Sequence, residues 1–194
     1  MHRIIKYTLL IIFFIFAGAV NVCLAEETRL IKGFELLTGF SKSKLHGQGN
    51  YYLYPVMFDV NFDLKQPLEK IGLRPPGLFQ FEIEPFVSYV SEPRKNVEAG
   101  SALMIKFGIL PETSRFQPFG RIGLGMLYMS LNTREQSTKF NFFEQGCIGA
   151  HYFFNKNFGL TMECRIRHLS NAGIRQPNHG INNLSYLLGV IYQY

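Results

Sequence analysis

The sequence contains no tryptophan and only three cysteines among its 194 residues. One of them, Cys23, lies in the apolar N-terminal segment, which leaves Cys147 and Cys164 as the only candidates for a disulfide in the rest of the chain. Side chains alternate between the two faces of a strand, and the positions of these two cysteines in their apolar segments point them to opposite faces. We therefore expect two free thiols.

Long apolar runs are also missing after the N-terminal segment. A helix that crosses a bilayer needs about 18 or more consecutive apolar residues, and no such stretch follows, so a helical membrane protein is excluded. Charge is modest: 20 basic and 14 acidic residues give a net charge of +6, without any basic run. This charge gives no support for nucleic acid as a partner. No histidine or cysteine cluster suggests a metal or a cofactor.

The N-terminal segment has the features of a secretory signal peptide. Arg3 and Lys6 precede an apolar run over residues 7–20, and Cys23-Leu24-Ala25 then offers small residues at a cleavage site. We expect cleavage after Ala25, which leaves residues 26–194 as one domain. A membrane anchor would need a longer run, and lipidation of Cys23 would need smaller residues than Asn21-Val22 before it.

The remaining chain is a series of segments in which apolar residues occupy every second position, which is the pattern of β-strands. In residues 51–63, for example, the even positions are apolar while the odd positions include Asp59 and Asp63. Each segment has about the 9–11 residues that a tilted strand needs to cross a bilayer. We expect short turns at one end and longer loops at the other, although 64–77 is too long for a short turn. The eight predicted strands are about 29–41, 51–63, 78–91, 99–110, 116–130, 140–154, 158–169 and 183–194.

One face of these strands carries charged residues and the other is almost wholly apolar. A soluble β-sandwich also alternates, but its core could not bury so many charges. A lipid-facing exterior around a polar interior explains both faces, and the final Tyr194 is typical of outer-membrane barrels. We therefore predict an all-β fold, an eight-stranded antiparallel transmembrane β-barrel of the outer membrane. Its interior should be filled by a structural ion-pair network rather than open as a pore. The expected inward charges are Asp59, Asp63, Glu82, Glu84, Lys106, Arg121, Glu163, Arg165 and Arg167.

His168 and Ser170 continue the outward row of the seventh strand, two residues apart and so on one face. A histidine is the usual general base and a serine a usual nucleophile. Asn182 extends the outward row of the last strand. Polar residues on the lipid side of a barrel, at the end of its strands, suggest a site whose substrate is a lipid lying alongside.

The stretch from His168 to Gly173, followed by Gln176-Pro177-Asn178 and Gly180, resembles the signature of the lipid A 3-O-deacylase family. The resemblance implies an outer-membrane enzyme, a carboxylic ester hydrolase that removes an ester-linked acyl chain from the lipid A of lipopolysaccharide. It implies no cofactor and no metal. Ser170 would be the nucleophile, His168 its general base, and the Asn171 side chain with the Gly173 N–H the oxyanion hole, whose donors typically contribute about 10²–10³ in rate.

The sequence departs from this family at the residue that orients the histidine. The family has a glutamate fourteen residues after it, and here that position is Asn182. In serine proteases the same acid-to-amide change lowers kcat by about 10⁴. Glu144 is the candidate substitute, because pairing Phe154 with Phe158 across a turn sets it opposite His168. The alternative is that Glu144 is a carboxylate at the rim of the barrel that makes a surface ion pair.

Two functions therefore remain open from the sequence. The first is an active lipid A esterase, with lipopolysaccharide as substrate and outer-membrane lipid as surroundings. The second is an inactive barrel of the same family with a structural or lipid- or partner-binding role. The intact His168, Ser170, Asn171 and Gly173 favour the first, and Asn182 favours the second. The acyl position and the formation of a homodimer are also left open.

Overall fold

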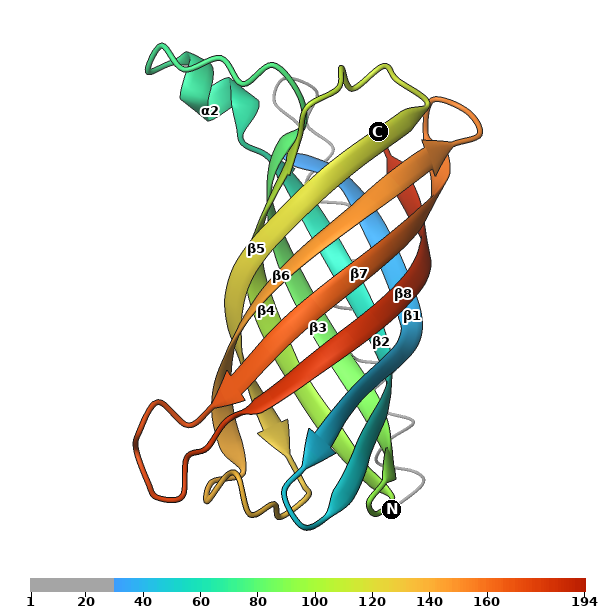
Figure 1. Cartoon of the computed structure of the whole chain (residues 1–194). Coiled ribbons are helices and arrows are strands. Elements are labelled where there is room, and N and C mark those ends of the chain that lie inside the picture. Colours follow the sequence, from blue (N-terminus) through green and yellow to red (C-terminus); the bar gives the residue numbers. More distant parts are fainter. Residues whose placement is uncertain (1–29) are drawn as a thin grey trace, which may run out of the picture. The chain divides into compact units, whose positions relative to one another are not determined.

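A computed structural model describes residues 30–194, so the predicted signal peptide lies outside the described residues. Each strand pairs antiparallel with its neighbours and β8 pairs with β1, which closes the sheet into a barrel (Figure 1). This confirms the predicted eight-stranded antiparallel barrel. The strands are β1 (Ile31–Leu45), β2 (Gly49–Asp63), β3 (Phe79–Glu92), β4 (Asn96–Gly108), β5 (Phe116–Met129), β6 (Phe140–Phe153), β7 (Phe158–Ser170) and β8 (Ile181–Gln193).

The two faces of the barrel wall follow the alternation in the sequence. Arg121 and Arg165 point inward and are at most 1% exposed. Their outward neighbours Ile122 and Ile166 are 59% and 65% exposed, as expected for side chains that face lipid. The predicted inside and outside rows are confirmed, and a shift of one residue in any strand would have reversed them.

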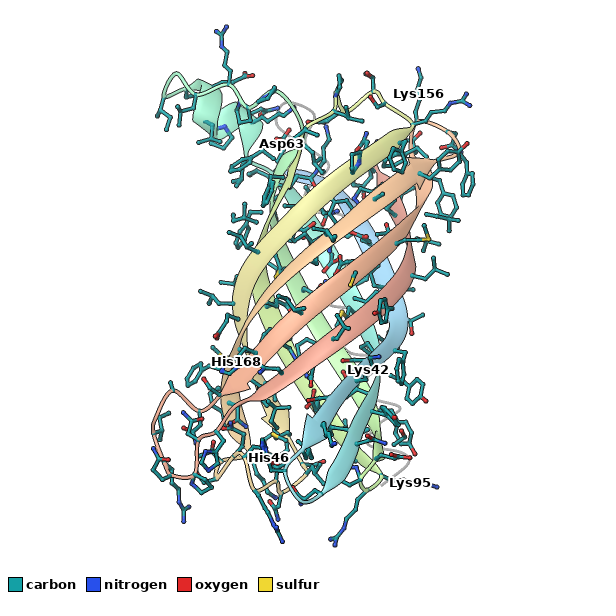
Figure 2. All side chains as sticks on the ribbon, viewed as in Figure 1. Lys42, His46, Asp63, Lys95, Lys156 and His168 are labelled. Atoms are coloured by element: carbon teal, nitrogen blue, oxygen red, sulfur yellow. The ribbon has the colours of Figure 1, made fainter. Side chains whose placement is uncertain are left out.

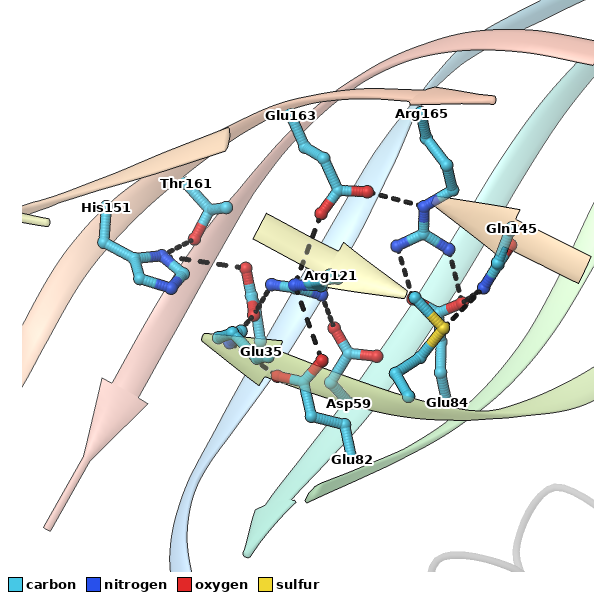
Figure 3. Close-up of polar contacts among 12 residues, drawn as sticks. Glu35, Asp59, Glu82, Glu84, Arg121, Gln145, His151, Thr161, Glu163 and Arg165 are labelled. Carbon is cyan, nitrogen blue, oxygen red and sulfur yellow. Dashed lines mark hydrogen bonds and ion pairs between the residues drawn. The ribbon is translucent and has the colours of Figure 1, made fainter. Parts of the chain in front are cut away.

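Acidic and basic side chains pair with one another inside the barrel, and Arg121 lies at the centre of the contacts in Figure 3. Its Nη1 donates to Asp59 Oδ2 at 2.9 Å, and its Nε lies 3.5 Å from Glu163 Oε2. Arg165 binds Glu84 with Nη2 2.6 Å from Oε2. Buried charges are tolerated only when they are paired in this way. The interior is therefore packed with side chains, and its acids and bases have structural partners.

The strands extend further than predicted at the end that carries His168. β1 reaches Leu45 and β4 already begins at Asn96, where the sequence no longer alternates between apolar and polar residues. The apolar pattern stops because side chains beyond the lipid belt need not be apolar, whereas backbone pairing continues. Lys42 still pairs with Leu184 across the β1–β8 seam.

The expected division into short turns at one end and long loops at the other is wrong. The end near His168 has tight turns at 46–48 and 93–95 as well as the longer loops 130–139 and 171–180. The longest connection, 64–78, is at the opposite end. Because antiparallel strands can be joined by turns or by loops, loop length alone does not identify an end of the barrel.

The 64–78 connection contains the short helix α2 (Lys65–Glu69), which the sequence did not predict. Lys65 Nζ lies 2.6 Å from Glu112 Oε1 in the next connection at this end, and Lys32 Nζ lies 2.9 Å from Glu112 Oε2. Burial would raise the pKa of Glu112, but hydrogen bonds and charges from Lys65 and Lys32 lower it below its usual value. Among the described residues, no helix is long and apolar enough to cross a membrane.

Both described cysteines are free thiols, as predicted. Cys147 pairs with Arg165 across the β6–β7 ladder, and Cys164 pairs with Ile148. Cys147 is buried and Cys164 is partly exposed on the other face. Their side chains therefore cannot meet without a change of register.

Candidate active site

The candidate site lies on the outer face of the barrel at one end of β7. His168 and Ser170 are half-buried there, in the same row as the exposed Ile166, and the 171–180 loop follows directly. Figure 2 shows His168 toward the end of the barrel that carries His46 and Lys95, with Asp63 and Lys156 at the opposite end. A polar pair has thus replaced apolar residues where the lipid-facing row meets the rim.

His168 is held by Asn182 from the neighbouring strand. The two residues are direct partners in the β7–β8 ladder, and His168 Nδ1 lies 2.5 Å from Asn182 Oδ1. An amide oxygen can only accept a hydrogen bond, so this contact places a proton on Nδ1. Nε2 is then free to accept a proton from a nucleophile, as in serine hydrolases.

Glu144 lies on the other side of His168, where the register predicted it. It is the direct partner of His168 in the β6–β7 ladder, and its side chain is exposed on the outer face. Within residues 30–194 the carboxylate makes no hydrogen bond or ion pair with the imidazole. The geometry thus gives the orienting contact to Asn182 and leaves Glu144 as a neighbouring charge.

The backbone under the site is anchored from inside the barrel. The inward neighbours of the three site strands, Phe143, Leu169 and Ile181, are all at most 2% exposed and belong to one apolar cluster. Side chains packed in this way hold the strands in register. Their sequence neighbours on the outer face, Glu144, His168, Ser170 and Asn182, are therefore attached to a rigid backbone. A preorganised site needs such support.

Ser170 ends β7, and the chain then turns sharply. It pairs with Phe142 of β6, and its hydroxyl makes no hydrogen bond with the His168 ring among the residues that the structure describes. Ala172 and Gly173 follow with φ of 53° and 76°, a left-handed pair that redirects the chain. Ala172 has a side chain in this region, which costs about 1–2 kcal/mol and marks a turn that its surroundings enforce.

The two groups expected to form the oxyanion hole are engaged inside the loop in this structure. Asn171 is fully buried, and its Nδ2 donates to the Arg175 carbonyl oxygen at 2.7 Å. The Gly173 N–H donates to Asn171 Oδ1 at 3.0 Å, and Asn178 Oδ1 accepts from the Asn171 N–H at 2.9 Å. The expected open pair of donors facing Ser170 is therefore not present in this arrangement. Asn171 follows the inward row of β7, so the alternation already pointed its side chain away from Ser170.

Gly180 contributes to the site in a way that residue type alone did not reveal. It lies just before β8 with φ of 75°, and a Cβ built there would lie 2.5 Å from His168 Cε1. A glycine is therefore needed both for the left-handed backbone and for the space beside the imidazole. In the sequence, only its place in the family signature indicates that Gly180 belongs to the site.

We expect Gly180→Ala to lower the rate of any reaction in which His168 acts as the base by about 10- to 100-fold, because the new methyl group displaces the imidazole and a misplacement of about 1 Å can cost 10² in rate. Gly49→Ala is the matched control: Gly49 has φ of 85°, and none of residues 30–194 lies within 4 Å of a Cβ built there. The two variants share the backbone strain, and Gly49→Ala should keep its activity. Equal losses in initial rate would show that strain, not the imidazole, is responsible.

A groove of about 710 Å³ opens on the outer face beside this site. It is lined by residues of neighbouring strands, among them Glu144 and Gly146 of β6, His168 of β7, Asn182 of β8 and Lys42 of β1. In the described part of the chain, no group of histidine, cysteine or carboxylate side chains is arranged to hold a metal ion. The arrangement offers a base, a hydroxyl and an adjoining groove on the side of the wall that faces lipid.

Comparisons with known proteins identify the family and the fold. The model of the family "Lipid A 3-O-deacylase (PagL)" matches residues 77–190, more than half of the chain. The crystal structure of the outer membrane enzyme PagL aligns with a TM-score of 0.63 at 18% identity, covering 80% of this chain and 97% of that one. Neisserial surface protein A aligns with a TM-score of 0.58 at 9% identity, over 84% and 96%. No curated protein matches the sequence. At these identities the two structures show a shared fold.

Proposed function

The chain belongs to the lipid A 3-O-deacylase family, and from this premise we propose that it is an outer-membrane serine esterase that removes an ester-linked acyl chain from lipid A. The observation that carries the proposal is the outward His168–Asn182 pair beside Ser170. A base and a hydroxyl on this face meet lipid rather than the packed interior. Lipopolysaccharide is the lipid that the family acts on, so its acyl esters are the proposed substrate.

In the proposed reaction Ser170 Oγ attacks the carbonyl carbon of the ester. Its proton passes to His168 Nε2, and a tetrahedral intermediate forms with a negative oxygen. The intermediate collapses when the bond to the sugar oxygen breaks, and the imidazolium returns its proton to that oxygen. Water, deprotonated by His168, then releases the fatty acid from Ser170. The Ser170 hydroxyl must rotate toward the imidazole for the first step, and catalytic hydrogen bonds often tighten only when substrate binds.

Asn182 is the proposed orienting residue for His168. The contact of 2.5 Å between its Oδ1 and Nδ1 supports this role, since it selects the tautomer whose Nε2 accepts a proton. An amide cannot stabilise the imidazolium as a carboxylate does, so we expect a slow enzyme. Glu144, on the other flank, is the carboxylate that would supply this stabilisation if it approached the ring.

The oxyanion hole in this proposal requires a change in the 171–180 loop. Asn171 Nδ2 and the Gly173 N–H would have to leave the Arg175 carbonyl and Asn171 Oδ1 to reach the intermediate. The loop is also tied to the 130–139 loop, because Ser137 Oγ donates to the Arg175 carbonyl oxygen at 2.9 Å. Substrate binding would have to compensate for these hydrogen bonds, each of which contributes about 1 kcal/mol.

Purified protein incubated with lipopolysaccharide in detergent tests the proposal. The expected products are one free fatty acid for each lipid A molecule and a lipid A lighter by that acyl chain, both identified by mass spectrometry. The position of the lost chain shows whether the 3-O ester is the substrate. Intact lipid A after long incubation with correctly folded barrel would contradict the proposed function.

The groove beside the site should hold the acyl chain that is removed. A larger side chain in place of Gly146 tests this. Gly146 faces outward between Glu144 and Ile148, and among the described residues a Cβ built there meets only the Arg121 carbonyl oxygen at 3.8 Å. Gly146→Leu should therefore fold normally but fill the groove. We expect the rate on lipid A to fall about tenfold or more, because a bulky side chain and the acyl chain would overlap.

Ala99→Leu is the matched control for this variant, since Ala99 is exposed on the outer face of β4, outside the groove. It adds the same bulk to the lipid-facing wall and should leave the rate unchanged. A short-chain ester such as a nitrophenyl acetate should be hydrolysed equally well by wild type and Gly146→Leu. A loss that is the same for short and long acyl chains would contradict an acyl groove over Gly146.

A second candidate function is an inactive barrel that binds lipid or a partner. The observation that favours it is the neutral Asn182 where the family has a glutamate, together with the engaged oxyanion donors. In that case the same purified protein would bind lipid A without releasing fatty acid. The assay above separates the two functions directly.

A further inference from the structure

Two lysines lie on the outer face next to the candidate site. Lys42 and Lys44 belong to β1, both are exposed, and both line the groove that His168 and Asn182 also line. Figure 2 shows Lys42 toward the same end of the barrel as His168. They occupy the outward row of β1 just beyond its apolar part, where the head groups of the lipids around the barrel would lie.

The strand register fixes where the two lysines lie relative to Asn182 and His168. Lys42 is the ladder partner of Leu184, and Asn182 lies two residues from Leu184 on the same face. Lys44 is two residues beyond Lys42, so the continued register brings it level with Asn182. Neighbouring strands are about 4.8 Å apart, which places β1 about 10 Å from His168 across the wall.

The groove is therefore polarised from one side to the other. Glu144 on β6 contributes negative charge, His168 and Asn182 lie in the middle, and the lysines on β1 contribute positive charge. Glu144 would repel an anionic head group, whereas the lysines would attract it. An anionic amphiphile can then lie across the groove in only one orientation, with its anionic group over β1.

The two lysines also lack neutralising partners. Within residues 30–194 neither forms an ion pair, whereas the buried Lys106 has Glu35 at 3.1 Å and Glu82 at 2.6 Å. A lone lysine near a membrane surface can simply extend its ammonium group to the head groups. Two unpaired ammonium groups on one row, directly beside a hydrolytic site and opposite a carboxylate, form a recognition element for a multiply charged anion.

We propose that Lys42 and Lys44 bind a phosphate monoester on the sugar of lipid A and so position the acyl ester over Ser170. The inference rests on the proposed function for its substrate class, a phosphorylated and acylated glucosamine lipid. An ammonium group donates charge-assisted hydrogen bonds to phosphate oxygens. The phosphorylated part of the sugar lies over β1 and the acyl chain over Gly146, with the scissile ester between them. Lys42 and Lys44 act as positioning residues.

Binding by Ser170→Ala protein tests this without any need for turnover. Fluorescent hexa-acylated lipid A with both phosphates is compared with the same lipid after its phosphates are removed. In the Ser170→Ala background, Lys42→Ala with Lys44→Ala should raise the Kd for the phosphorylated lipid at least tenfold, since each lost hydrogen bond to a charged group is worth about that factor. The Kd for the dephosphorylated lipid should stay the same.

Two further variants complete the design. Lys42→Arg with Lys44→Arg keeps both charges and should bind as tightly as the lysine protein. Lys95→Ala removes an exposed lysine in the 93–95 turn at the same end of the barrel, outside the groove, and should have no effect. An excess of phosphatidylglycerol should displace little of the phosphorylated lipid A, because a general attraction for anionic membranes is not the proposed role.

The proposal is overturned if the double alanine variant binds both lipids equally well, or if it loses affinity for both alike. Full displacement by phosphatidylglycerol would overturn it as well. The outcome is separate from the fate of the esterase function. A wild type that releases no fatty acid but binds phosphorylated lipid A through the lysines would refute the esterase and keep the binding site. Fatty acid release that depends neither on the two lysines nor on the phosphates would refute the phosphate-binding site and keep the esterase function.

Discussion

Ser170→Ala should abolish the release of fatty acid from lipopolysaccharide, and His168→Ala should do the same. In serine hydrolases the loss of either residue lowers kcat by roughly 10⁶, because nucleophile and base act as one unit. The double variant should therefore be no slower than either single variant. Initial rates with purified lipopolysaccharide, followed by fatty acid release, give the comparison.

Both variants should still form the barrel, since neither side chain takes part in the buried interior. Leu169 between them is fully buried and carries the packing of this part of β7. Heat-modifiable migration in gel electrophoresis and a β-rich circular dichroism spectrum check the assembly. Wild-type rates in Ser170→Ala would rule out the proposed nucleophile, even if His168→Ala were inactive.

Asn182→Glu should raise the rate of an active wild type. A carboxylate at this position fixes the Nδ1–H tautomer as the amide does and also stabilises the imidazolium that forms when Ser170 loses its proton. The corresponding acid-to-amide change in serine proteases costs about 10⁴ in kcat, which sets the upper limit of the gain. Asn182 is exposed on the outer face, so the new charge need not be buried. We expect a smaller gain because the surrounding residues are not arranged for it.

The opposite pattern is expected if Glu144 stabilises the imidazolium. Glu144→Gln, which is nearly isosteric, should then lower the rate steeply, and Asn182→Glu should change little or place two carboxylates beside one histidine. The pair of kcat values from the two variants therefore identifies the residue that assists His168. If neither variant changes the rate of an active wild type, both accounts are wrong. If Asn182→Glu creates activity in an inactive protein, the natural chain is the inactive barrel.

The barrel could be predicted from the sequence because its physical cause is local. A lipid-facing wall requires an apolar residue at every second position, and the register of β6 and β7 follows once Phe154 and Phe158 flank their turn. Glu144 lies opposite His168 for this reason, as predicted. The same rule predicts that Cys147 and Cys164 lie on opposite faces, as they do in the structure.

Features that depend on contacts outside the strands could not be predicted in this way. Asn171 and Gly173 satisfy each other within the loop, and only the folded loop reveals that their donors are engaged. The space that Gly180 leaves for His168 depends on where the loop returns to β8. The extension of β1 that carries Lys44 lacks the apolar alternation because it lies beyond the lipid belt, and the alternation therefore predicts that this strand ends near residue 41.

The central claim is that Ser170, on the outer face of the barrel, cleaves an acyl ester of lipid A. The most direct measurement compares lipid A from cells that make equal amounts of the wild-type barrel or of Ser170→Ala, by mass spectrometry. The account predicts a species lighter by one acyl chain with the wild type only. An identical lipid A profile in both strains, with both barrels present in the outer membrane, would contradict it.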